Sequence, residues 1–149
     1  MSDCFVCRKH RGEIDVPGGA ICEDELVYSS HGIIGEDGRD AYLGTLFVEP
    51  RRCVSGFGDL TRPEAERVGF TASRLAAALR VTERAEHVHL FVLGAHVPHL
   101  HVWIVPRYPG TPREFWNSRL TAWPGAPRGG PTEIAALCER VRAHLRESA

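Results

Sequence analysis

The sequence predicts an α+β fold in which two main helices pack on a sheet of short strands. Two segments, one following Thr61 and one at about 132–147, repeat apolar residues at helical spacing. Short runs rich in Val, Ile, Leu and Phe lie before and between them and are bounded by Gly, Pro and Asp, which is typical of strands. With 149 residues, 43% of them hydrophobic, we expect one domain over 1–149 with a core of its own.

The strand candidates before the first helix are GGAICEDELVYSSHGII (18–34) and AYLGTLFVEP (41–50). The second ends at Pro50, which has no N–H for a sheet hydrogen bond, and we expect the two segments to pair antiparallel. The first helix then begins at a capping box, because Thr61 can cap it and Glu64 lies three residues further on. Its apolar stripe consists of Ala65, Val68, Ala72, Leu75, Ala76 and Leu79.

Two further strand candidates, EHVHLFVLG (86–94) and HLHVWIVPR (99–107), are joined by a short connection through Gly94 and Pro98. Successive side chains of a strand point to opposite faces. In the second candidate one face carries Leu100, Val102 and Ile104, and the other carries His99, His101 and Trp103. We expect the apolar set to face the core and the histidine set to face a functional site.

Residues 109–130 are rich in Pro, Gly, Arg and Trp and have no useful periodicity, so we expect an ordered loop or lid there. The C-terminal helix at about 132–147 places Ile134, Leu137, Cys138, Val141 and Leu145 on one side. No internal repeat or low-complexity linker divides the sequence.

The charges of the chain nearly balance. Eighteen basic and 19 acidic residues give a formal net charge of −1, which indicates neither a nucleic acid polymer nor a membrane surface as partner. The first residues, MSDCFVCRKHRGE, lack an apolar signal core, and no apolar run approaches the length of a membrane span. We therefore expect a cytoplasmic protein whose partner is a small molecule.

Five cysteines, an odd number, fit reduced cytosolic thiols better than a disulfide framework. Cys4 and Cys7 have the C-x-x-C spacing that lets two thiolates reach one metal ion from a tight turn. The same spacing arises in redox pairs and by chance, so the pair indicates a metal site only together with further ligands.

The order of strands and helix, together with the stretch VPHLHVWIVPR (97–107), resembles the histidine triad (HIT) superfamily. Its motif is His-x-His-x-His followed by two apolar residues, and the resemblance extends from the C-x-x-C pair to Arg107. It implies a HIT-like α+β fold with a roughly five-stranded antiparallel sheet, commonly in a homodimer. It also implies a nucleotidyl hydrolase or transferase that acts on a nucleoside phosphate derivative through a nucleotide attached to the middle histidine, here His101.

The chemistry of that reaction suits a histidine. A neutral imidazole that donates a hydrogen bond from one nitrogen to a backbone carbonyl keeps its other nitrogen free to attack phosphorus. Since an unperturbed imidazole has a pKa near 6.5, it is mostly neutral at pH 7. Attack yields a phosphorylated histidine, which splits one difficult displacement into two easier ones.

The resemblance also implies a metal. In the metal-containing branch, the first histidine of the triad closes a structural zinc site with a C-x-x-C pair and a residue from the strand before the first helix. Here FVEPRRCVSGFGDL (47–60) resembles that strand segment, with Cys53 where the family usually has histidine. The resemblance therefore predicts Zn²⁺ bound by Cys4, Cys7, Cys53 and His99. Four protein ligands leave no open position, so this Zn²⁺ would be structural and would hold the neighbourhood of His101.

Three positions depart from the family pattern. Trp103 stands where the third histidine is expected, and an indole offers one N–H donor, no acceptor and far more bulk. Gly94-Ala95-His96 replaces the family's Gly-Gln-Ser or Gly-Gln-Thr, so His96 is either a substitute acid or phosphate ligand or an exposed loop histidine. An acidic residue that binds ribose in some relatives falls near Ser30.

The long loop offers residues that could compensate. Arg107, Arg113 and Arg119 could approach a phosphate, because a guanidinium presents a planar set of donors. Phe115, Trp116 and Trp123 could cover a base or another planar substrate by stacking. The alternative is that these aromatic residues pack the loop onto the domain or a dimer partner.

Three functions follow as hypotheses. The leading one is a zinc-stabilised HIT-type enzyme that cleaves a nucleoside phosphate derivative, with His101 as nucleophile and His96 as acid or phosphate ligand. The second is an enzyme on the same fold that has been diverted to a non-nucleotide substrate of specialised metabolism, with these two histidines as acid and base. The third is a non-catalytic nucleotide-binding module, in which Trp103 fills the place of the catalytic group.

Overall fold

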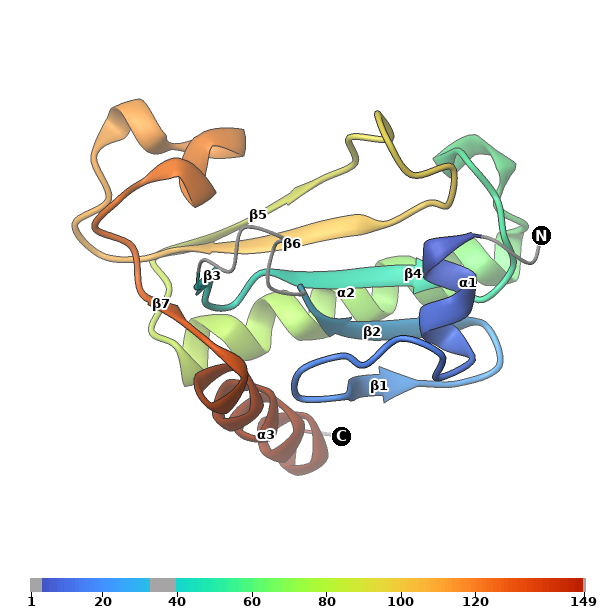
Figure 1. The fold of residues 1–149 in the computed structure, drawn as a ribbon, viewed down its shortest axis with the longest axis horizontal. Coiled ribbons are helices and arrows are strands. Elements are labelled where there is room, and N and C mark those ends of the chain that lie inside the picture. Colours follow the sequence, from blue (N-terminus) through green and yellow to red (C-terminus); the bar gives the residue numbers. More distant parts are fainter. Residues whose placement is uncertain (1–3, 33–39, 149) are drawn as a thin grey trace.

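The computed structural model describes residues 4–32 and 40–148, and its centre is an antiparallel five-stranded sheet (Figure 1). The strand order is β1-β2-β4-β6-β5, and every neighbouring pair is antiparallel. The strands are β1 (Ala20–Glu23), β2 (Val27–His31), β4 (Leu46–Pro50), β5 (His87–Phe91) and β6 (Val102–Arg107). The two main helices are α2 (Arg62–Thr82) and α3 (Pro131–Glu147). The predicted α+β fold is thus confirmed.

Helix α2 begins as its capping box predicts. Thr61 is the N-cap, its hydroxyl accepts a hydrogen bond from the Glu64 N–H, and the Glu64 carboxylate accepts one from the Thr61 N–H. The apolar sides of α2 and α3 pack against one face of the sheet and form the main core. Its fully buried members include Leu46, Val48, Leu75, Leu79, Ile104, Ile134, Leu137 and Val141. Leu100 and Val102 are buried as well, which confirms the predicted apolar face of 99–107.

Two local boundaries differ from the sequence-based expectation. The segment 41–50 divides into β3 (Ala41–Tyr42) and β4, because Gly44 turns the chain with a φ of +90°. A Cβ at Gly44 would lie 2.7 Å from the Pro106 ring, so the turn also needs a residue without a side chain. Strand β6 begins at Val102 rather than at position 99, since the Leu100 N–H donates to the Val54 carbonyl outside the sheet.

The C-x-x-C pair lies at the start of a short helix, α1 (Phe5–His10). In Figure 1 this helix lies across β2 and β4, on the face of the sheet opposite α2. Cys4 is its N-cap and Cys7 lies in its first turn, so a helix start rather than an isolated turn presents the two thiols.

The predicted loop 109–130 is ordered and covers the other end of that same face. It contains two 3₁₀ segments, Arg113–Phe115 and Asn117–Ala122, and the short strand β7 (Arg128–Gly129), which pairs with β3. Leu120 and Ala126 of the loop pack in a second apolar cluster on the sheet. The other members of this cluster are Tyr42, Phe91, Trp103, Val105, Tyr108 and Trp123. The face opposite α2 is therefore covered at one end by α1 and at the other by 109–130.

His31 closes β2 with two hydrogen bonds and should make stability depend on pH. Its Nδ1 donates to the Gly32 carbonyl at 2.8 Å, and its Nε2 accepts from the Gly44 N–H at 2.9 Å. Burial lowers the pKa of His31. On acidification, this histidine is therefore protonated near pH 6.5 in the unfolded chain but stays neutral to lower pH in the folded protein. The free energy of unfolding contributed by His31 should consequently fall as the pH drops from 7 to 5.

Urea unfolding of wild type and His31→Gln at pH 7, 6 and 5 checks this prediction. Because glutamine does not titrate, the difference in the free energy of unfolding between the two proteins should narrow as the pH falls. A difference that stays constant across the range would show that His31 is not held neutral.

None of the helices within 4–32 and 40–148 has both the length and the apolar content of a membrane-spanning helix.

Candidate functional site

The four residues predicted to bind zinc converge at the start of α1. The ligand atoms of Cys4, Cys7, Cys53 and His99 all lie within 4.8 Å of one another. The Nδ1 of His99 is 3.4 Å from the Cys4 sulfur and 3.5 Å from the Cys7 sulfur. A tetrahedral Zn²⁺, with bonds of about 2.3 Å to sulfur and about 2.0 Å to nitrogen, separates these atoms by roughly 3.5 Å. The spacing thus fits a metal site with three sulfur ligands and one nitrogen ligand.

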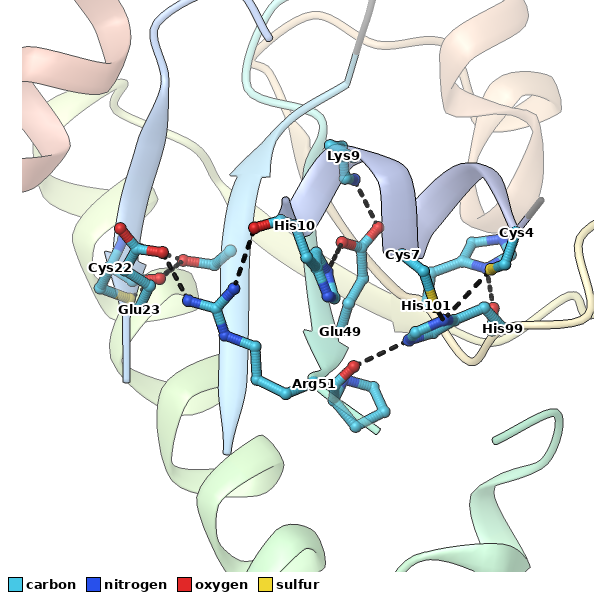
Figure 2. Close-up of polar contacts among 12 residues, drawn as sticks. Cys4, Cys7, Lys9, His10, Cys22, Glu23, Glu49, Arg51, His99 and His101 are labelled. Carbon is cyan, nitrogen blue, oxygen red and sulfur yellow. Dashed lines mark hydrogen bonds and ion pairs between the residues drawn. The ribbon is translucent and has the colours of Figure 1, made fainter. Parts of the chain in front are cut away.

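The orientation of His99 also fits a metal ligand. Its ring is fully buried, and its Nε2 donates to the Pro50 carbonyl at 2.8 Å, as Figure 2 shows. That bond assigns the proton to Nε2 and leaves Nδ1 as a bare nitrogen directed at the sulfurs. Burial further lowers the pKa of His99, so the imidazole stays neutral.

The thiols themselves favour a bound cation. Burial raises the pKa of Cys7 to about 12, and the adjacent Cys4 and Cys53 act in the same direction. Burial acts likewise on Cys4, but hydrogen bonds from backbone N–H groups of α1 and from the thiols of Cys7 and Cys53 together outweigh it and lower the pKa of that thiol. One sulfur therefore ionises more easily than its neighbour, and a divalent ion would supply the positive charge that lets all three be thiolates.

His101 lies two residues after His99, one of the four predicted metal ligands, and the backbone of His99 holds its ring. Its Nδ1 is 2.8 Å from the carbonyl of His99, in the geometry of an N–H donating to that oxygen (Figure 2). The other ring nitrogen, Nε2, then has no proton and is free to act as a nucleophile or acceptor. The structure thus gives His101 the orientation that a nucleophilic imidazole requires.

His101 lies in a cleft of about 180 Å³ between α1 and the sheet. The cleft is lined by Phe5, Val6, Lys9, His31, Gly32, Phe47, Glu49, Val97, His101 and Trp103. A second cavity of about 340 Å³ lies on the far side of Phe47 and Trp103. That cavity is lined by Gly32, Ala41, Tyr42, Thr45, Phe47, Trp103, Thr121 and Arg128. The 109–130 segment thus forms part of the wall of this neighbouring cavity.

Trp103, the predicted variant position of the triad, forms the wall between the two cavities. Its ring lies 4.6 Å from the Phe47 ring and 6.2 Å from the His101 ring, measured between centroids. Its indole N–H is buried and has no hydrogen-bond partner among the described residues. A buried donor without a partner is costly.

A buried ionic network that sequence reasoning missed lies beside the cleft. Glu49 on β4 accepts hydrogen bonds from Lys9 Nζ at 2.6 Å and from His10 Nε2 at 2.9 Å, and all three side chains are at most 6% exposed (Figure 2). Burial by itself raises the pKa of Glu49, but the hydrogen bond from His10 and the charge of Lys9 hold it below its usual range. The network joins α1 to the sheet next to the four predicted metal ligands.

Two other predicted site residues lie outside the cleft lining. His96 is exposed on the connection between β5 and β6, where its neighbour Val97 lines the cleft instead. Ser30 is opposite Phe47 in the sheet and is fully buried, with a hydroxyl that has no partner among the described residues. The structure does not bring either side chain to His101, and their roles in catalysis and ribose binding stay predictions.

The predicted phosphate and stacking residues of the loop come together with one another rather than with His101. The Arg107 guanidinium lies 3.8 Å from the centroid of the Trp116 ring, and that of Arg113 lies 5.1 Å away. Arg107 also reaches Glu86 at 3.8 Å and His89 at 3.5 Å. None of these side chains lines the cleft, so packing of the loop accounts for the arrangement, and substrate binding stays a prediction.

An Arg107→Met variant separates these two roles. Methionine keeps much of the apolar contact with Trp116 but removes the cation, so the free energy of unfolding should fall by about 1 kcal/mol. Urea denaturation measures this loss, and an Arg113→Met variant serves as the control at the longer ring distance. Unchanged stability with weakened nucleotide binding would instead assign Arg107 to the substrate.

The comparisons with known proteins agree on the fold. No protein-family model matches the sequence. The bifunctional bis(5'-adenosyl)-triphosphatase/adenylylsulfatase FHIT of Arabidopsis thaliana is 34% identical over 70 residues. That match spans 44% of this chain and only 39% of the relative.

Solved structures match over nearly the whole chain. A Zn-bound histidine triad family protein from Mycobacterium smegmatis superposes with a TM-score of 0.74 at 19% identity, over 99% of both chains. A hypothetical histidine triad nucleotide-binding protein from Sulfolobus tokodaii gives 0.74 at 16% identity, over 97% of this chain and 93% of that one. A histidine triad protein from Sinorhizobium meliloti gives 0.69 at 20% identity, over 97% and 98%. The chain therefore has the histidine triad fold.

Proposed function

We propose that this chain is a histidine triad enzyme with a structural Zn²⁺, which cleaves or transfers a nucleoside phosphate derivative through a nucleotide bound covalently to His101. The observation that carries the proposal is the 2.8 Å contact between His101 Nδ1 and the His99 carbonyl, which leaves Nε2 unprotonated at the edge of the cleft. The fold shared with nucleotide-binding proteins and the partial match to a dinucleoside triphosphatase support the same reaction.

Cys4, Cys7, Cys53 and His99 would hold the Zn²⁺, whose charge would stabilise three neighbouring thiolates. The role of His99 in the reaction is positional. Its ring is held by the hydrogen bond from Nε2 to the Pro50 carbonyl and would be held by the metal at Nδ1. Its own carbonyl accepts the hydrogen bond that orients the ring of His101. The tautomer of the nucleophile thus depends on the backbone next to a metal ligand.

The reaction would proceed in two displacements. His101 Nε2 attacks the α-phosphorus, a nitrogen–phosphorus bond forms, and the bond to the leaving group breaks with its electron pair on that group. Water or an acceptor hydroxyl then attacks the same phosphorus, loses its proton to solvent, and releases His101. The indole of Trp103 cannot transfer a proton to the leaving group, so leaving groups that depart as stable anions are favoured.

A panel of substrates tests this function. Zinc-loaded protein should cleave dinucleoside polyphosphates or nucleotide sugars, whose leaving groups are phosphates, faster than nucleoside phosphoramidates, whose amines need a proton. Product analysis by chromatography and phosphorus NMR measures each rate. Absence of both turnover and nucleotide binding across the panel would overturn the proposal.

The diverted enzyme is the second candidate, and one observation favours it. Two aromatic walls, Phe47 and Trp103, line the space next to His101, and an indole stands in place of a proton donor. Turnover of a small molecule that is not a nucleotide, lost in His101→Ala and not inhibited by nucleotides, would establish this candidate.

A further inference from the structure

Lys9 places a buried ammonium group in the lining of the cleft. The side chain is 5% exposed, and the one hydrogen bond it makes within the described residues is to Glu49 Oε1 at 2.6 Å. An ammonium group has three N–H donors. The rings of Tyr28 and Phe47 lie 5.7 Å from the nitrogen and offer only their π faces to the rest. Two N–H donors of Lys9 thus lack an oxygen or nitrogen partner in this part of the chain.

Attachment of α1 to the sheet does not account for those donors. His10, the next residue, already binds the second oxygen of Glu49 at 2.9 Å, and the cysteines of the same segment converge with His99. A buried ammonium group is costly unless its donors are satisfied. An acceptor atom of a ligand in the cleft would satisfy them.

The position of Lys9 relative to His101 indicates which part of a ligand it meets. Both residues lie near the same aromatic ring, because the Phe47 centroid is 5.7 Å from Lys9 Nζ and 5.8 Å from the His101 ring. A nucleotide whose phosphate lies at His101 can therefore place its base on the Phe47 side of the cleft, with an edge toward Lys9. Aromatic and apolar side chains of Phe5 and Val6 line the same cleft.

We propose that Lys9 is a specificity-determining residue that donates to a carbonyl oxygen of the substrate's base, so that the cleft favours oxo-substituted over amino-substituted bases. This inference rests on the proposed function. An ammonium group can only donate, so it attracts a carbonyl and opposes an exocyclic amino group, which also donates. Glu49 already accepts one hydrogen bond at each of its two oxygens, from Lys9 and from His10.

Inosine monophosphate (IMP) and adenosine monophosphate (AMP) form the pair for the test. IMP has an oxo group at position 6 and a protonated N1, whereas AMP has an amino group at position 6 and an unprotonated N1. Calorimetric titration of the zinc-loaded protein should give at least tenfold tighter binding of IMP, as expected for a hydrogen bond to a charged donor. The double variant Lys9→Met/Glu49→Gln removes the ammonium group without leaving a buried carboxylate unpaired. It should bind both nucleotides within about threefold of each other.

Glu49→Gln alone is the control, since its amide oxygen can still accept from Lys9 and the preference for IMP should persist. Zinc content and the melting temperature of each variant show whether the site formed by the four predicted metal ligands is intact. If Lys9 had a purely structural role, the double variant would bind both nucleotides more weakly by the same factor. The ratio of their dissociation constants would then be unchanged, which would overturn the inference. Wild-type protein that binds AMP as tightly as IMP would also overturn it, while the proposed function would stand. Wild-type protein that binds neither nucleotide would overturn the inference as well, and the proposed function would then be decided by the substrate panel described above.

Discussion

Cys53→Ser should lose its bound zinc and a large part of its stability. Three ligands would remain, and the thiolates of Cys4 and Cys7 would lie close together without enough positive charge beside them. Loss of a structural metal site is among the most destabilising single changes, and we expect at least about 3 kcal/mol. In a domain of this size that corresponds to a fall in melting temperature of about 10 °C.

Zinc content by elemental analysis and melting temperature by calorimetry measure the two effects on the same sample. Cys22→Ser is the matched control, because Cys22 is a partly buried cysteine on β1 that contacts Ser29 and is not part of the cluster. It should keep one zinc ion per chain. If Cys53→Ser also kept its zinc and its melting temperature, Cys53 would not be a ligand of the metal.

His101→Ala should lower turnover of the best substrate by about 10³-fold or more while leaving zinc content unchanged. The large effect is expected because alanine removes the nucleophile itself, and with it the covalent route. The small structural effect follows from position, since His101 is only partly buried and the one hydrogen bond it makes among the described residues is to the His99 backbone.

Steady-state rates of wild type, His101→Ala and His87→Ala provide this comparison. His87 lies exposed on β5, away from the cleft lining, and controls for the general effect of removing a histidine. A His96→Ala variant measured alongside tests the predicted acid or phosphate ligand. Residual activity of His101→Ala within tenfold of wild type would remove His101 from the reaction.

Local signals were sufficient for most of the fold. The start of α2 is encoded by Thr61 and Glu64, which contact each other directly, and its buried face by a stripe within one segment. The alternation of Leu100, Val102 and Ile104 likewise indicates which face of one strand is buried. Such signals depend on neighbours in the sequence, and a single sequence therefore contains them.

The parts that could not be predicted depend on distant contacts. Helix α1 has six residues, too few to be stable alone, and its attachment to the sheet depends on Glu49, forty positions away from Lys9. A single acidic residue in the apolar run LFVEP was the available signal for that network. The contact between Arg107 and the Trp116 ring could not be predicted from the sequence, because it depends on how 109–130 folds back onto the sheet. The four predicted metal ligands were grouped through the family resemblance, since spacing alone could not connect Cys53 to Cys4.

The most direct test of the central claim is the detection of a nucleotide on His101 itself. Zinc-loaded protein mixed with its best substrate from the panel is quenched in alkali, which preserves phosphoramidate bonds, then digested and analysed by mass spectrometry. We expect a peptide that contains His101 to gain the mass of one nucleoside monophosphate less one water within the first turnover, and the same peptide of His101→Ala to gain none. Turnover that proceeds without such a label in the wild type, or with the label on another residue, would contradict the mechanism.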